Sequence, residues 1–346
     1  MKLYPLKFKP YLAERVWGGR GLSELCADIA ETSGLIGEVW CVFGKLPVKN
    51  GCYAGLTLNE LCLRYPESFF PKGCDVSGMK EAFEFPLLIK WLKAEHWLSV
   101  QVHPDDESAE KLSGGAASGK TEAWYVTNVK DGASLILDKE PDVSVGALLS
   151  AKGPHIVKHL KFVKPECGDS FLIEAGMIHA LGPGITVLEV QQNSDITYRL
   201  YDWDRLGLDG RARDLHLREA EYVMNRRHEK RLESHKSGGV YQKNFIYPAP
   251  VGKILAVTDY FRMELLNFHI SAEPSVCQCS SECIWQAPDS HGSEILVCTK
   301  GEFDIDFAGS TESLVYGEAC VLPGGGLVRL RTCERDAEIV RVIMPF

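Results

Sequence analysis

The sequence predicts a mainly β protein made of two β-barrel-like domains, of which the first is larger and carries helices. Two observations lead to this prediction. Short alternating or apolar runs separated by Gly and Pro recur along the whole chain, and helical patterns are fewer. In addition, residues 168–181 align without gaps with residues 317–330, which indicates that the two halves are copies of one unit.

The expected strands are runs in which apolar and polar residues alternate or several apolar residues follow one another. In the first half they are residues 85–92, 98–103, 123–127, 170–175, 185–192 and 197–203. The second half continues with similar runs, among them "EILVCTKGEFDIDF" and "AEIVRVIMPF". Helices are expected at residues 57–70, 104–115, 142–153 and 213–231. The first of them opens with Thr57 and Glu60, the pattern of a capping box.

A charged segment, residues 225–239, marks the expected domain boundary. It is basic, repeats no apolar face and ends in Gly-Gly, which is typical of a solvated helix end that leads into a linker. The expected domains are therefore residues 1–235, with the helical insertions, and residues 236–346. In the internal repeat Val328 takes the position of His179, so the second copy lacks the polar group of the first.

The composition is that of a globular chain: 346 residues, 45% hydrophobic and 25% charged. A net charge of -9 argues against nucleic-acid binding through bulk attraction to phosphates, but it permits a small phosphorylated substrate. We expect a cytoplasmic protein with no membrane partner, because no apolar run reaches the length of a membrane span and no signal peptide is evident. The 12 cysteines are expected to be mainly reduced core residues. A zinc site at Cys277, Cys279 and Cys283 is the less favoured alternative.

The stretch "SVQVHP" places Ser99, Gln101 and His103 on one face of a strand and two valines on the other. The later pattern "GDSFLIEAGMIH" ends in His179 and resembles the second conserved motif of the cupin β-barrels, with Glu174 where that motif usually has proline. In that architecture the histidine points into the barrel beside residues of an earlier strand pair. Gln101, His103, Glu122 and His179 are then expected to converge.

Such a group has the chemistry of a metal site. Two imidazoles and a carboxylate are common ligands of zinc, and an amide oxygen can complete the shell while a position stays open for water or substrate. Taken alone, each histidine is better interpreted as an ordinary core or surface residue, and only their combination reverses that. Gln101 is the least secure ligand, because its amide is equally suited to hydrogen-bond a bound water.

Longer blocks carry a more specific resemblance. "FPLLIKWLKAEHWLSVQVHPDD", "GKTEAWYV" and "AGMIHALGPGITVLEVQQNSDITYRLYDWDR" are similar to blocks of the type I mannose-6-phosphate isomerases in their short bacterial form. The resemblance is close over residues 1–235, and the remainder matches the family's degenerate second barrel. It implies two cupin-like jelly-roll barrels, the second metal-free, and one Zn²⁺ per chain. It also implies interconversion of mannose 6-phosphate and fructose 6-phosphate through an enediol, in a monomer or homodimer.

The same resemblance assigns site residues. Its ligands fall on Gln101, His103, Glu122 and His179. Its active-site arginine falls on Arg199, its pocket lysines on Lys90 and Lys120, and a serine on the phosphate side of the pocket on Ser99. The resemblance therefore implies catalytic roles for Arg199, Lys120 and Lys90, and substrate contacts for all four residues.

Residue chemistry gives partial support to these roles. Lys90 interrupts an apolar run, where a lysine is costly to bury unless it is paired or used, although a snorkelling lysine is the plain alternative. Arg199 lies in an alternating strand and suits a phosphate or enediolate oxygen, with an ion pair to Asp195 or Asp202 as its alternative. The base that moves the proton stays open among Lys90, Lys120, a metal-bound water and a carboxylate.

Two other functions remain in competition. Another metal-dependent cupin enzyme, such as a different sugar-phosphate isomerase or an iron oxygenase, has the same type of ligand set. A non-catalytic sugar-phosphate-binding regulator would keep the pocket without turnover. The sequence also predicts that Val328→His creates no second metal site, because the second half offers no Gln-x-His and no partner glutamate.

Overall fold

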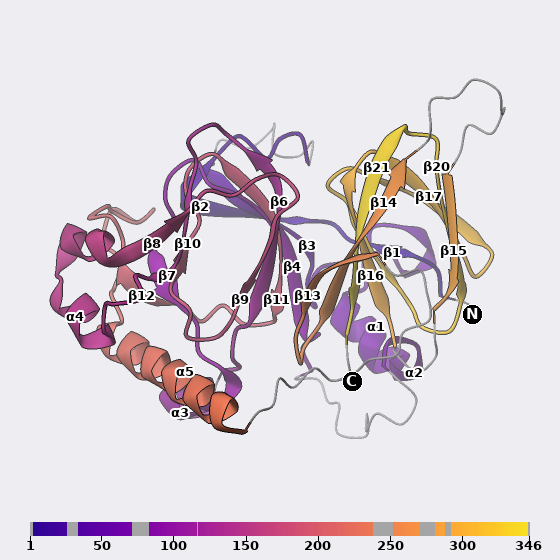
Figure 1. Cartoon of the computed structure of the whole chain (residues 1–346). Helices are drawn as coiled ribbons and strands as arrows, with labels where there is room; N and C mark the ends of the chain where they lie inside the picture. The colour runs from indigo at the N-terminus through magenta and orange to yellow at the C-terminus, as the bar shows by residue number, and fades with distance from the viewer. Residues whose placement is uncertain are drawn as a thin grey trace.

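The computed structural model describes residues 3–25, 34–70, 83–115, 117–237, 252–269, 281–287 and 292–344. Over this part of the chain the strands form four sheets, arranged as two pairs with helices beside each pair (Figure 1). The prediction of a mainly β protein is confirmed. Closure of each pair into a barrel stays a prediction.

The first pair of sheets is built from the N-terminal half. One sheet has the strand order β2 (Tyr11–Gly19), β3 (Ile36–Val42), β4 (Leu87–Lys93), β11 (Ile185–Gln192), β6 (Glu122–Val129), β9 (Ser170–Ile173). The other has the order β12 (Tyr198–Tyr201), β5 (Val100–Val102), β10 (His179–Ala180), β7 (Leu135–Lys139), β8 (Leu160–Val163). Side chains of both sheets, such as Trp124 and Leu135, share one apolar cluster.

The second pair comes mainly from the C-terminal half. Its larger sheet runs β1 (Leu6–Lys7), β19 (Ala319–Leu322), β16 (Glu294–Lys300), β21 (Asp336–Ile343), β14 (Arg262–His269), β13 (Lys253–Val257). Its partner runs β15 (Ser281–Gln286), β20 (Leu327–Thr332), β17 (Glu302–Phe307), β18 (Ser310–Val315). The first strand of the chain therefore belongs to the C-terminal sheet.

The predicted internal repeat is visible in the topology. Five neighbouring strands of one sheet correspond, in the same spatial order and the same order along the chain, to five strands of the other half. They are β9, β6, β11, β4, β3 in the first half and β19, β16, β21, β14, β13 in the second. The turn glycines also match: Gly168 and Gly317 have φ of 90° and 88°, and Gly176 and Gly325 have φ of 78° and 83°. Only glycine adopts such angles without strain, which explains the glycines at corresponding places.

The two halves share a core. One apolar cluster contains Ile89 and Trp91 of β4 together with Val321 and Val340 of the C-terminal sheet. The Trp91 indole also donates a buried hydrogen bond of 3.0 Å to the Gly317 carbonyl. The predicted division at residues 235 and 236 stays a prediction, because α5 (Leu217–Ser237) runs past it and residues 238–251 lie outside the described part.

The helices largely follow their sequence signals. Thr57 and Glu60 form the expected capping box, and Asp105 caps the next helix by accepting a hydrogen bond from the Ser108 amide. Two predicted helices differ from the structure. Residues 57–70 form two helices instead of one, α1 (Leu58–Arg64) and α2 (Pro66–Phe69), and Pro66 begins the second. The helix expected at 213–231 begins later and continues to Ser237, so the basic segment is helical as far as it is described. The other helices are α3 (Asp106–Ser113) and α4 (Val145–Ser150), with 3₁₀ turns at Gly51–Tyr53 and Gly153–His159.

The structure can be compared with two expectations from composition, on membrane spans and on cysteines. None of the helices among the described residues combines the length and the apolar character that crossing a membrane requires. Buried free cysteines are found at Cys41, Cys62, Cys298 and Cys320, as expected. The alternative zinc site at Cys277 and Cys279 lies outside the described residues.

Candidate active site

Three side chains predicted as metal ligands converge inside the first pair of sheets. His103 follows β5, Glu122 opens β6 and His179 opens β10, and all three are buried. The two Nε2 atoms lie 3.1 Å apart, and each is 3.5 Å from an oxygen of the Glu122 carboxylate. These residues form a group whose ligand atoms all lie within 4.8 Å of one another.

The backbone orients both imidazoles. Nδ1 of His103 lies 2.7 Å from the Ile196 carbonyl, and Nδ1 of His179 lies 2.9 Å from the Met177 carbonyl. Because a carbonyl only accepts, each Nδ1 carries the hydrogen and each Nε2 presents a lone pair.

Burial, followed by the charge of Lys120, holds the pKa of His103 well below its usual value. Burial also lowers the pKa of His179. Two neutral imidazoles therefore direct lone pairs at each other beside a carboxylate, an arrangement that a bound cation stabilises. The residues fit a zinc ion.

Gln101 lies opposite His179 across the β5 and β10 ladder. Its amide nitrogen is 3.2 Å from Nε2 of His179, and its amide oxygen accepts a 3.0 Å hydrogen bond from the Ser99 hydroxyl. Turning the amide over would exchange the two atoms, since the Ser99 hydroxyl is able to donate or accept. Gln101 as a ligand through its oxygen stays a prediction.

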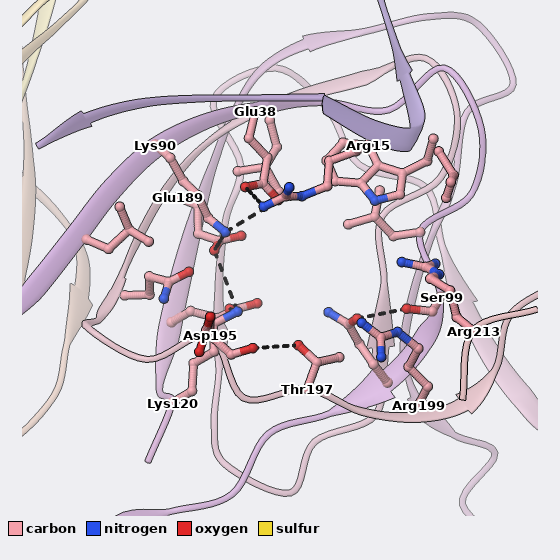
Figure 2. A pocket seen from close by; sticks show the side chains of 18 of the residues that line it. Arg15, Glu38, Lys90, Ser99, Lys120, Glu189, Asp195, Thr197, Arg199 and Arg213 are labelled. Carbon is pink, nitrogen blue, oxygen red and sulfur yellow. Dashed lines mark hydrogen bonds and ion pairs between the residues drawn. The ribbon is translucent and has the colours of Figure 1, made fainter. Parts of the chain in front are cut away.

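A cavity of about 540 Å³ opens beside this group. Figure 2 shows side chains from several strands that point into it. Six of the residues assigned through the resemblance line it: Lys90, Ser99, Gln101, Lys120, Glu122 and Arg199. The two histidines, His103 and His179, are buried behind the lining, where both contact Glu122.

One wall of the cavity is a network of charges (Figure 2). The Lys90 ammonium lies 3.1 Å from the Glu189 carboxylate and 3.7 Å from that of Glu38. Arg15 of β2 holds Glu38 through two hydrogen bonds of 3.1 and 2.9 Å, and the Trp40 indole donates a third of 2.7 Å. Lys90 is therefore a paired, buried lysine and not a snorkelling one.

The network sets the protonation of its members. Burial acts to raise the pKa of Glu38, but Lys90 and then Arg15 outweigh it and bring that pKa to about 2. Burial acts to lower the pKa of Lys90, but Glu189 and Glu38 outweigh it and raise that pKa. Burial and then the charge of Glu122 raise the pKa of Glu189. Glu38 and Lys90 are held ionised, whereas Glu189 is the carboxyl group that gains a proton most easily.

Lys120 lies between the ligand group and this wall. Its ammonium is 2.9 Å from the Glu122 carboxylate, 3.3 Å from Nε2 of His103 and 3.9 Å from the Glu189 carboxylate. The backbone amide of Lys120 donates to the Pro104 carbonyl, which fixes the loop directly after the His103 strand. As expected from alternation, Lys120 and Glu122 face the same side.

The opposite wall carries Ser99, Arg199 and Arg213 (Figure 2). Asp202 pairs with Arg205 at 2.9 Å and with Arg213 at 2.6 Å, and no ion pair joins Arg199 to a carboxylate among the described residues. The alternative in which Arg199 is paired with Asp195 or Asp202 is therefore wrong. Burial and then the neighbouring Arg213 lower the pKa of Arg199, which is the electrostatic setting of an anion site.

Sequence reasoning missed part of the cavity. Arg15, Glu38, Glu189 and Arg213 line it, and none of them was assigned a role from the sequence. Glu189 interrupts an apolar run in the way that Lys90 does, so the same signal was present. Arg15 had no such signal, because it enters the site through the pairing of β2 with β3. Three tryptophans, Trp17, Trp40 and Trp124, border the cavity as well.

The C-terminal half contains a counterpart of the site. Glu122 lies opposite Ile173 and Glu294 lies opposite Leu322, at equal places in the repeat. By the same comparison Trp285, opposite Val328, replaces Gln101. Trp285 and Arg341 both donate hydrogen bonds to Glu294, at 3.0 and 2.9 Å.

A partner glutamate for residue 328 therefore exists, contrary to the expectation from sequence. We still expect Val328→His to bind no second zinc. Ala287 stands two residues after Trp285, where the first half has His103, and Glu294 is already held by Arg341. Zinc per chain, determined by atomic absorption after dialysis, should be the same as in the parent protein. Two equivalents would contradict this.

Comparison with known proteins agrees with this geometry. Residues 6–130 match the model of the phosphomannose isomerase type I catalytic domain. The chain is 39% identical over 228 residues to the mannose-6-phosphate isomerase ManA of Bacillus subtilis, which covers 65% of this chain and 69% of that protein.

Solved structures share the fold over nearly the whole chain. A mannose 6-phosphate isomerase from Bacillus subtilis has a TM-score of 0.71 at 24% identity, covering 98% of this chain and 99% of its own. A zinc-bound mannose 6-phosphate isomerase has a TM-score of 0.66 at 16% identity, covering 99% and 100%. The chain belongs to the family of type I phosphomannose isomerases.

Proposed function

We propose that the protein is a zinc-dependent isomerase that interconverts mannose 6-phosphate and fructose 6-phosphate. The observation that carries the proposal is a group of two buried imidazoles and a carboxylate, of which the carboxylate lines a cavity whose opposite wall carries an arginine without an ion pair among the described residues. The choice of substrate is supported by the family, because a relative in it is named mannose-6-phosphate isomerase.

His103, Glu122 and His179 would hold the metal, with the Gln101 amide as the fourth candidate. When bound, zinc would act as a Lewis acid that polarises the substrate oxygens at C1 and C2. The lone-pair geometry of the two Nε2 atoms supports this assignment, as does the zinc in a protein of the same fold.

Arg199 and Ser99 would bind the phosphate. Arg199 lacks a carboxylate partner in the described part of the chain, and a guanidinium matches the geometry of phosphate oxygens. Arg213 lies on the same wall, where its charge adds to the attraction for an anion. Binding at this wall would direct the other end of the sugar towards Lys120 and Glu189.

Lys120 and Glu189 would handle the proton that moves between C1 and C2. Lys120 lines the cavity, and burial raises the pKa of Glu189, which favours a carboxyl group that takes and returns a proton. Lys90, whose pKa is raised, would stay an ammonium and stabilise negative charge on the substrate oxygens. The division at residue 235 and a monomer or homodimer remain predictions.

The test is turnover of mannose 6-phosphate by the purified protein before and after chelation. We expect chelation to abolish turnover and one equivalent of zinc to restore it. Turnover that survives complete removal of metal would exclude the metal role. A folded, zinc-loaded protein without turnover would indicate a non-catalytic binding protein, and faster turnover of another sugar phosphate would change the substrate.

A further inference from the structure

Helix α5 packs behind the metal-ligand group. It covers the outer face of the sheet formed by β12, β5 and β10, whose inner side contributes Gln101 and His179. Residues of α5 and of these strands share one apolar cluster, which includes Ala220, Val223 and Met224 together with Val100, Val102, Ile178 and Ala180. Figure 1 shows α5 beside α3 at this end of the molecule.

The segment 174–178 connects both imidazoles. Its Gly176 amide donates a 2.7 Å hydrogen bond to the His103 carbonyl, and its Met177 carbonyl accepts from Nδ1 of His179. The Ile178 carbonyl in turn accepts a 2.6 Å hydrogen bond from the Asp138 amide. A shift of this segment would therefore move the acceptor that orients His179.

Arg227 of α5 holds the segment from outside. Its guanidinium lies 2.6 Å from the Asp138 carboxylate and 3.3 Å from that of Glu174. The side chains of Arg227 and Asp138 are only 14% and 28% exposed, so solvent screens this pair less than an ordinary surface pair, whereas the Glu174 side chain is 56% exposed. Glu174 stands where the cupin motif usually has proline. The segment is therefore held here by the ion pair with Arg227 instead of by the stiffness of a proline ring.

Close packing leaves the segment little freedom. Gly176 has φ of 78°, and a Cβ at this position would lie 2.9 Å from the Val223 carbonyl of α5. Two further cations of α5 reach the start of α3, just after His103: Lys230 lies 2.6 Å from Asp105, and Arg226 lies 2.8 Å from Glu107. The basic face of α5 thus contacts the segments next to both histidines.

We propose that Arg227 is a positioning residue of the metal centre. By pairing with Asp138 and Glu174 it fixes the segment 174–178, and through the Met177 carbonyl it fixes the ring of His179. This inference rests on the proposed zinc site. Groups that orient a ligand change metal affinity by about 10- to 100-fold when removed. Arg227 acts one contact further out, so we expect the lower end of that range.

The experiment measures zinc release from the full-length, zinc-loaded protein to a chromophoric chelator. We expect Arg227→Met to release zinc about tenfold faster than the parent, and Arg227→Lys to restore most of the difference. Arg218→Met is the matched control, since Arg218 is an exposed arginine of the same helix that forms no ion pair with another described residue. It should release zinc at the parental rate.

A second readout separates positioning from general loss of stability. The Co²⁺-substituted Arg227→Met protein should show changed d–d absorption, while its metal-free form melts within about 2 °C of the parent. Parental release and spectrum in Arg227→Met would overturn the proposal. A parent protein that binds no zinc would instead overturn the proposed function.

Discussion

Lys120→Met is expected to lower kcat by about 10³-fold, the middle of the range for loss of a positioned acid or base. The Lys120 ammonium lies on the cavity surface between the carboxylates of Glu122 and Glu189. Methionine keeps the length and the apolar stem of the side chain, but it carries neither a charge nor a transferable proton. The transfer of the proton between C1 and C2 would then lack the amine that we propose takes part in it.

Zinc should remain bound in this variant. The lysine charge is 3.3 Å from Nε2 of His103, so its removal takes away repulsion towards a cation at that atom. The measurement is steady-state kinetics with zinc content determined on the same sample. Lys161→Met, at an exposed lysine of β8, is the control and should keep parental kcat. Retained turnover in Lys120→Met would remove Lys120 from the mechanism, and loss of zinc would make it a structural residue.

Arg341→Met should destabilise the fold by about 3–5 kcal/mol, the effect of removing one partner from a buried ion pair. The Arg341 side chain is 2% exposed and lies 2.5 Å from the Glu294 carboxylate and 3.6 Å from that of Glu264. Its removal leaves the buried Glu294 carboxylate without its neutralising charge, whereas Glu264 keeps its ion pair with Arg262. Methionine fills a similar space, so lost volume explains little of the effect.

The free energy of unfolding from urea denaturation of the metal-free protein measures this loss. Arg329→Met removes an exposed pair with Glu282 in the same half and should change stability by less than about 1 kcal/mol. If uncompensated charge is the cause, replacing Glu294 by leucine in the Arg341→Met background should recover much of the loss, while Glu264 stays paired with Arg262. A change below about 1 kcal/mol in Arg341→Met would show that water reaches the cluster.

Much of the site could be predicted from the sequence, because successive side chains of a strand point to opposite faces of the sheet. Gln101 and His103 share a face for that reason, and so do Lys120 and Glu122. The capping box at Thr57 is equally local, and the structure contains it. Matching glycines and the vacated histidine position at Val328 also made the repeat recognisable without a structure.

Residues that enter the site through pairing of distant segments were not predictable. Arg15 and Glu38 meet Lys90 because β2, β3 and β4 are neighbours, and nothing in the local pattern of the first two strands states this pairing. The role of α5 was missed for a related reason. A basic helix end is usually solvated, and only the fold shows that its charges lie against Asp138 and Asp105.

The position of β1 has a consequence for the order of folding. Leu6 pairs with Val321, and the ammonium of Lys7 donates to the Ser313 carbonyl, 306 residues further along the chain. During synthesis the first strand emerges long before its partner exists, and closing so long a loop is slow. Lys7 can contact residues 49 and 50 early, but both residues of β1 lack their strand partners until β19 has been synthesised.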